Sequence, residues 1–169
     1  MMGRWCYVCV LCLATAGGAG EVVIDAFEGP VGWTVNPDGG ASPPVRARRD
    51  TEHAKQGNAA LRLTYADAPP HWSNLQRAVT VPPSAVAIRL WLRVHKAEPQ
   101  AAMHFWLFEP DNDGWLTRVP PRGKALAEMV GGWHEIVVPI SAFRFQPRGP
   151  RTRQMTTASK MLIGCNFGD

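Results

Sequence analysis

Apolar and polar residues alternate with a period of two along most of this chain. The alternation is clearest over residues 86–95, whose aliphatic side chains share one face: Ile88, Leu90, Leu92 and Val94. The opposite face carries Arg89, Trp91, Arg93 and His95. This period predicts a β-strand with one face in a core and the other in water.

Short runs of this kind recur between clusters of Gly, Pro and Asp, and we find no amphipathic helix of useful length. The strands expected are residues 22–27, 45–49, 59–65, 74–81, 86–95, 101–109, 115–119, 132–140 and 160–167. Residues 29–44 are expected to form a loop, and Asp113 with Gly114 a hairpin turn. Many short strands separated by turns predict an all-β fold, an antiparallel β-sandwich.

Residues 1–20 are built like a secretory signal. Arg4 is followed by an uncharged apolar run, and Ala14 and Ala16 form a small-x-small cleavage pattern, with a second one at Gly18 and Gly20. The apolar run is shorter than the roughly 20 residues that span a bilayer. We therefore expect residues 21–169 to form one exported domain without a membrane attachment, and an uncleaved N-terminal anchor is the alternative.

The cysteines are consistent with bacterial export. Cleavage would remove Cys6, Cys9 and Cys12 and leave Cys165, which excludes an internal disulfide. An exported protein that folds without disulfides suits a bacterial periplasm, cell surface or medium better than an animal ectodomain.

The formal net charge of +4 falls to +3 when Arg4 is removed. No Asp or Glu occurs between Ile136 and Gly168, where basic residues gather: Arg144, Arg148, Arg151, Arg153 and Lys160. These residues form either a solvated loop or a surface for an acidic polymer such as an anionic polysaccharide. Export and the absence of a binding motif argue against nucleic acid.

Four segments in order along the chain resemble a bacterial carbohydrate-binding domain of the galactose-binding-like jelly-roll type. They are Asp25-Ala26-Phe27-Glu28 with Trp33, Gly57-Asn58-Ala59-Ala60-Leu61-Arg62-Leu63, Ile88-Arg89-Leu90-Trp91-Leu92, and Gly132-Trp133 through Pro139-Ile140-Ser141-Ala142-Phe143. Leu162-Ile163-Gly164 is similar to the penultimate strand of such domains. The chain most resembles family-11 carbohydrate-binding modules and complex I intermediate-associated domains.

The resemblance implies a non-catalytic module that binds a polysaccharide or oligosaccharide, as the N-terminal ancillary domain of a larger polysaccharide-degrading protein. Such domains usually finish with a further strand, which this sequence lacks. We therefore expect a sandwich without its last strand and a catalytic domain outside this sequence.

Six residues are the candidate sugar-binding set: Arg89, Trp91, Arg93, His104, Trp106 and Trp115. Indole rings stack on the apolar faces of sugars, while Arg and His side chains hydrogen-bond hydroxyls or acidic groups. If the strands that carry Trp91 and Trp106 pair in register, their side chains make one patch. The alternative is that the rings of Trp91 and Trp106 are both buried in the core. Trp115 follows the expected hairpin turn, and its ring is expected to bind sugar from a position on or next to a loop.

The resemblance also implies a structural calcium ion, to which Asp25 and Glu28 correspond by position. Calcium takes six to eight oxygen ligands, and the C-terminal Asp partner expected from the resemblance is missing.

No catalytic motif is present in the sequence, and no two carboxylates form a glycosidase pattern. Two alternatives to the binding module stay open: an exported protein-interaction sandwich without sugar affinity, and a fragment of a polysaccharide lyase or hydrolase with His104 as its base.

Overall fold

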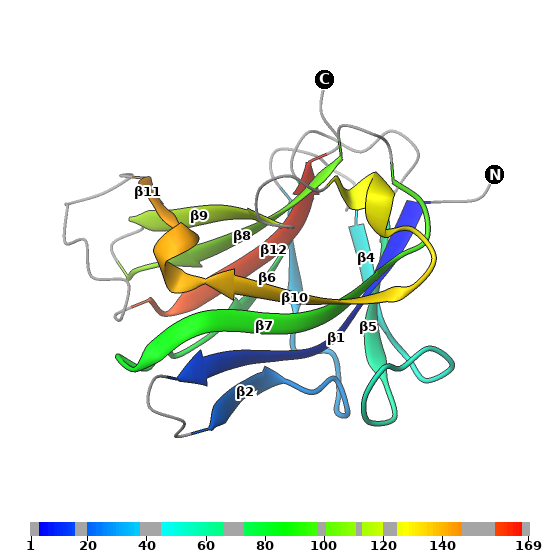
Figure 1. Ribbon diagram of the computed structural model, residues 1–169, viewed down its shortest axis with the longest axis horizontal. Helices are drawn as coiled ribbons and strands as arrows, with labels where there is room; N and C mark the ends of the chain where they lie inside the picture. The colour runs from blue at the N-terminus through cyan, green and yellow to red at the C-terminus, as the bar shows by residue number, and fades with distance from the viewer. Residues whose placement is uncertain are drawn as a thin grey trace.

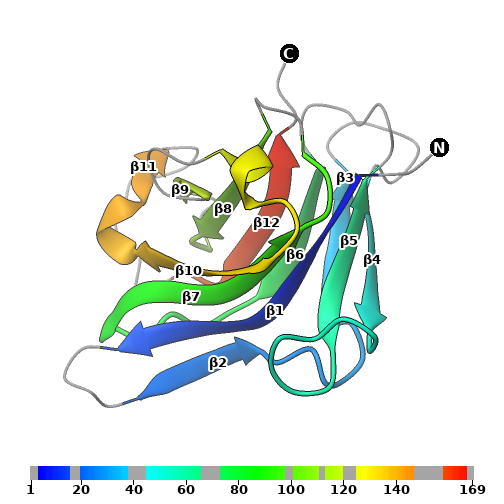
Figure 2. The same ribbon diagram turned by 45° about the vertical axis from the view of Figure 1, so that its right-hand side comes forward.

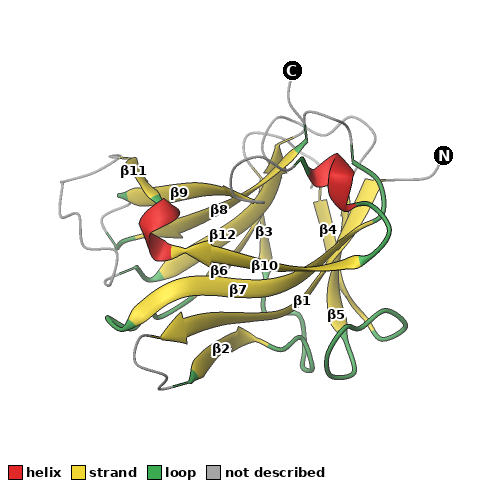
Figure 3. Cartoon of the chain, viewed as in Figure 1, coloured by secondary structure: helices red, strands yellow, loops and turns green. Residues whose placement is uncertain are grey.

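The computed structural model describes residues 4–15, 20–37, 45–65, 73–97, 101–110, 113–119, 125–146 and 158–166. Of the basic residues that gather near the C-terminus, Arg148, Arg151 and Arg153 lie outside these residues. Two six-stranded antiparallel sheets pack face to face, which confirms the all-β sandwich (Figures 1 and 3). The helical elements among the described residues are two single-turn 3-10 helices, η2 (Leu126–Met129) and η3 (Ile140–Ala142). No helix in this part of the chain is both long and apolar enough to cross a membrane.

The first sheet, called sheet A, has the strand order β10-β7-β1-β5-β4, and β2 also pairs with β1. Its strands are β1 (Arg4–Thr15), β2 (Glu21–Asp25), β4 (Val45–Asp50), β5 (Ala60–Tyr65), β7 (Ala85–Val94) and β10 (Trp133–Pro139).

The second sheet, sheet B, has the order β11-β9-β8-β12-β6-β3. Its strands are β3 (Thr34–Pro37), β6 (Ser73–Ala78), β8 (Ala102–Phe108), β9 (Gly114–Val119), β11 (Arg144–Gln146) and β12 (Lys160–Asn166). The predicted hairpin is confirmed: β8 and β9 pair from Phe108 opposite Gly114, and Glu109 N–H donates to Asp113 O at 2.9 Å.

The core lies between the inner faces of the two sheets. Ile88, Leu90 and Leu92 of β7 are fully buried, as their alternation predicts. Sheet B supplies Phe105 and Met161 opposite them. Burial of this aliphatic and aromatic surface is the main force that holds the layers together.

The N-terminal segment has a place in this fold that the sequence does not suggest. β1 lies between β7 on one side and β5 with β2 on the other, in the middle of sheet A (Figure 2). Leu11 is fully buried, and Cys6 and Cys12 are buried. An uncharged apolar run suits a leader peptide and a central strand equally well, because both environments exclude water. The export signal stays a prediction.

Two expectations about the strands were wrong. The expected loop 29–44 contains the edge strand β3, which pairs with β6. The consecutive strands β7 and β8 also lie in different sheets: β7 pairs with β10 and β1, whereas β8 pairs with β9 and β12. The register between Trp91 and Trp106 that a single patch requires therefore does not exist.

Candidate functional site

The predicted sugar-binding residues are divided between three surfaces. Arg89, Trp91 and Arg93 lie on the outer face of sheet A, opposite the core-facing aliphatic residues of β7. His104 and Trp106 lie on the outer face of sheet B, because Met103, Phe105 and Leu107 face the core. Trp115 points to the core side of sheet B, opposite Leu107.

Trp91 is half-buried near the middle of the outer face of sheet A. Along β7 it is flanked by Arg89 and Arg93, and across the sheet it is opposite Glu135 of β10. The Lys55 ammonium lies 4.8 Å from the centre of the indole ring, within the range of a cation–π contact. An aromatic ring with cations beside and above it is suited to a flat ligand that carries negative charge.

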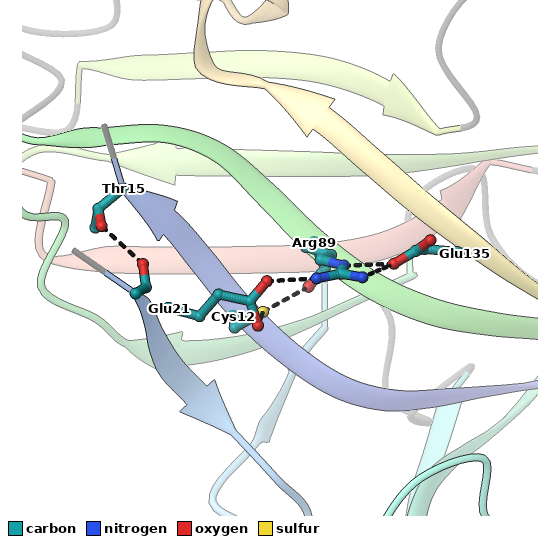
Figure 4. Close-up of polar contacts among 6 residues, drawn as sticks. Cys12, Thr15, Glu21, Arg89 and Glu135 are labelled. Atoms are coloured by element: carbon teal, nitrogen blue, oxygen red, sulfur yellow. Dashed lines mark hydrogen bonds and ion pairs between the residues drawn. The ribbon is translucent and has the colours of Figure 1, made fainter. Parts of the chain in front are cut away.

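Arg89 is held in place by two carboxylates, one on each side of its strand (Figure 4). Nη1 donates to Glu21 Oε1 of β2 at 2.7 Å, and Nε and Nη2 both contact Glu135 Oε1 of β10. Hydrogen bonds to the two carboxylates raise the pKa of Arg89 above its usual range, and the hydrogen bond from Arg89 lowers the pKa of Glu21. The arginine is therefore fixed as a cation beside Trp91.

Further arginines lie across the same face on β4 and β5. Arg48 is opposite Arg62 in register, and Arg46 is opposite Thr64. Asp50 lies within 3.6 Å of Arg48 and 3.8 Å of Arg62 and offsets part of this charge. Positive charge exceeds negative charge over this face, which favours an anionic ligand.

The outer face of sheet B carries a second, more buried cluster. Trp106 stacks on Phe108 with ring centres 5.3 Å apart and an interplanar angle of 11°, and both pack with Leu162. The Trp106 side chain is only 7% exposed and His104 only 6%. Both residues are therefore buried, although they lie on the outer face of sheet B; of the two rings that the alternative interpretation places in the core, Trp106 is buried and Trp91 is half-buried.

His104 lies in a row that crosses sheet B. Gly164 of β12 is opposite both His104 and Asn74, and Arg118 of β9 is opposite His104 on its other side. Burial lowers the pKa of His104 to about 4, and the nearby Arg118 charge acts in the same direction. The imidazole is consequently neutral at neutral pH.

A groove next to the edge strand β3 of sheet B is not predictable from the sequence. It measures about 330 Å³ and is lined by Gly32, Thr34, Gln76, Arg77, Ala78, Ser159 and Lys160. The lining comes from β3, β6, β12 and the segments next to them, which are far apart in the chain. No local sequence motif could therefore have indicated it.

The contacts of Trp115 are those of a residue that stabilises the fold. It lies on β9, its Nε1 donates to Glu109 Oε1 at 3.4 Å, and its ring packs against Phe145 with centres 5.0 Å apart. These contacts join β9 to β11 and leave the ring half-buried rather than carried on a loop.

The two residues expected to hold calcium are engaged with hydrogen-bond donors. Asp25 accepts from Phe27 N–H at 2.7 Å and Trp33 Nε1 at 2.9 Å and pairs with Arg77. Glu28 accepts from Asn58 N–H at 2.6 Å, and its other oxygen lies 3.7 Å from Arg49. Carboxylates that already face guanidinium groups do not fit a calcium site in this arrangement.

One acidic group of the described residues has ligand-like spacing, formed by Asp50, Glu52 and His53. The Asp50 carboxylate accepts hydrogen bonds from the backbone N–H groups of Glu52 and His53 at 3.0 and 3.1 Å. Burial would raise the pKa of Asp50, but these hydrogen bonds and the His53 side chain lower it overall. The group is explained as a turn that the Asp50 carboxylate stabilises.

Comparison with known proteins adds no relative: no family model, no curated protein and no solved structure matches this chain. The functional assignment must therefore come from the geometry of the chain itself.

Proposed function

We propose that this protein is an exported, non-catalytic carbohydrate-binding module whose binding platform is the outer face of sheet A. The observation that supports this most directly is the half-buried Trp91 ring between Arg89 and Arg93, with Lys55 against the ring. A sugar ring would stack on the indole in place of the Lys55 ammonium, and the neighbouring cations would bind hydroxyl or carboxylate groups. We also propose that the sandwich is a jelly roll of the galactose-binding-like type.

The charge of the platform favours an acidic polysaccharide over a neutral one. Five arginines on β4, β5 and β7 lie on the same face of sheet A as Trp91: Arg46, Arg48, Arg62, Arg89 and Arg93. The carboxylates close to them are Glu21, Asp50 and Glu135. A uronate polymer would offset the excess positive charge, and its binding would weaken as salt screens the attraction.

The test is a binding titration of the full chain against polygalacturonate, alginate and a neutral β-glucan. Trp91→Ala should weaken binding to the acidic polymers at least about tenfold, which corresponds to roughly 1.4 kcal/mol. Val137→Ala is the matched control, because Val137 lies opposite Arg89 on the same face and is 49% exposed. Equal affinity of the two variants, or no binding by folded protein to any of the polymers, would overturn the proposal.

A protein-interaction domain is the second candidate, and one observation favours it. Arg89 is already paired with two carboxylates, as expected of an ion pair whose role is to support the sheet. In that case Trp91 would bind a protein side chain, and no glycan would compete for the surface.

A further inference from the structure

The segment with the composition of a leader peptide occupies the middle of sheet A. Ala14, where the first small-x-small pattern begins, lies in β1, and Gly20, where the second pattern ends, directly precedes β2. Cleavage at either place would therefore cut the chain between two paired strands. It would break the covalent link between β1 and the rest of the chain and leave the sequence of every other strand intact.

Loss of β1 would divide sheet A. Residues 6–15 of β1 pair with β7 and residues 4–8 with β5, while β2 pairs with residues 11–14. Without β1, the pair β4–β5 and the pair β7–β10 have no strand between them, and β2 loses its partner among the described strands. Facing strand edges with unpaired backbone N–H and C=O groups are a template for another strand.

The two bordering strands determine which strand would fit. On the core side, β5 and β7 present fully buried aliphatic side chains: Leu61, Leu63, Leu90 and Leu92. On the outer side, Arg62 and Arg93 are both opposite position 7 of β1, and Arg89 is opposite position 12. Arg89 is already paired with Glu21 and Glu135 (Figure 4), so the charge that distinguishes one inserted strand from another lies opposite position 7.

We infer that the position between β7 and the β5–β2 edge is a strand-acceptor site, which residues 4–15 fill in the uncleaved chain. After cleavage it binds an extended segment of a partner polypeptide, antiparallel to β5 and β7. The inserted segment carries apolar residues toward the core and an acidic residue opposite Arg62 and Arg93. The natural occurrence of cleavage rests on the export proposed above, but the acceptor site and its test do not.

The experiment keeps the full chain. A specific protease site is placed within residues 16–20, the protein is folded intact, and it is then cut, so that the N-terminal segment is held only by strand pairing. Synthetic 12-residue peptides that copy residues 4–15 are added with isotope labels. Native mass spectrometry measures how much of the original segment each peptide displaces.

Two peptides form the matched pair. The acidic peptide carries Tyr7→Glu and the basic peptide carries Tyr7→Lys, with all other residues unchanged, because position 7 lies opposite both Arg62 and Arg93. We expect the acidic peptide to displace the segment at a concentration at least about fivefold lower, because cross-strand pairs of opposite charge are favoured over pairs of like charge. A third peptide with Leu11→Asp should fail to bind, because position 11 is fully buried.

Several results would overturn the inference. Equal displacement by the acidic and basic peptides would show that the site does not select a partner strand for its acidic residue. A cut protein that never exchanges its segment, even after passage through denaturant, would show that the site does not accept a strand from another polypeptide. A cut protein that dimerises through the vacated edges would make a second copy the occupant. Peptide exchange is read without any glycan, so its failure and the failure of sugar binding are separate results.

Discussion

Arg89 of β7 and Glu21 of β2 are hydrogen-bonded at 2.7 Å although β1 lies between their strands. The pair crosses the outer surface of β1 and links the two strands that border its C-terminal half (Figure 4). The contact therefore exists only while β1 is in place, and the coupling between the two side chains reports on that state.

We expect a double-mutant cycle with Arg89→Gln and Glu21→Gln to give a coupling free energy of about 0.2–1 kcal/mol at low salt. The value is small because the two side chains are 42% and 40% exposed, and water and ions screen the attraction. Urea unfolding of the four proteins measures it. A coupling that does not decrease in 1 M salt would contradict an exposed ion pair.

Gly57→Ala should destabilise the protein by about 1–3 kcal/mol. Gly57 has a φ of +66°, and a Cβ atom there would collide with the Glu28 carboxylate, which accepts the hydrogen bond from Asn58 N–H. Thermal unfolding measures the loss. Gly29→Ala is the control, because Gly29 has open space around it and no positive φ, and a similar loss in both variants would show that the position is not special.

Trp106→Ala should cost about 3–5 kcal/mol of stability, because it removes a buried ring from the cluster with Phe108 and Leu162. Trp91→Ala should cost much less, since its ring is half-buried on the outer face of sheet A. Chemical denaturation of both variants gives the comparison. The reverse order of stabilities would place Trp91 in the core and remove it from the binding platform.

The wild-type protein should lose stability as the pH falls from about 6.5 toward 4, in part through His104. Burial and the Arg118 charge lower its pKa to about 4 in the folded state, so below the usual histidine pKa the unfolded chain takes up a proton that the folded chain does not. A shift of this size corresponds to roughly 3 kcal/mol once the pH reaches the folded pKa. The contribution is absent above the usual histidine pKa, where both states are neutral.

His104→Gln should lack this component, so its stability should fall less steeply between pH 6.5 and 4. Urea unfolding of both proteins at several pH values measures the two slopes. Identical slopes would mean that His104 is protonated in the folded protein at these pH values.

Cys12 should resist alkylation at pH 8 in the folded, uncut protein. Its side chain is only 2% exposed, and burial together with the hydrogen bond to Glu21 raises its pKa to about 11, so little of the reactive thiolate is present. Peptide-level mass spectrometry after timed alkylation measures the rate. Denatured protein is the control, and equal rates in the two samples would show that β1 does not occupy its place in sheet A.

The amino-acid sequence by itself determined most of the strands and the core-facing side of the most regular one, but not β1, β3 or β11. The burial of Ile88, Leu90 and Leu92 follows from alternation, because a strand turns successive side chains to opposite sides and only one side of each sheet meets the core. The hairpin between β8 and β9 was predictable for a similar reason, since a short turn with glycine joins adjacent antiparallel strands.

Only the tertiary structure decided which faces meet. Trp91 and Trp106 lie on consecutive strands with similar patterns, yet one is half-buried on sheet A and the other is buried on sheet B. Strand pairing and sheet packing are non-local, and alternation within a strand carries no information about its neighbours. The place of residues 4–15 was undetermined for the same reason: an apolar run is equally suited to a leader and to a central strand, and only the neighbours on either side distinguish the two.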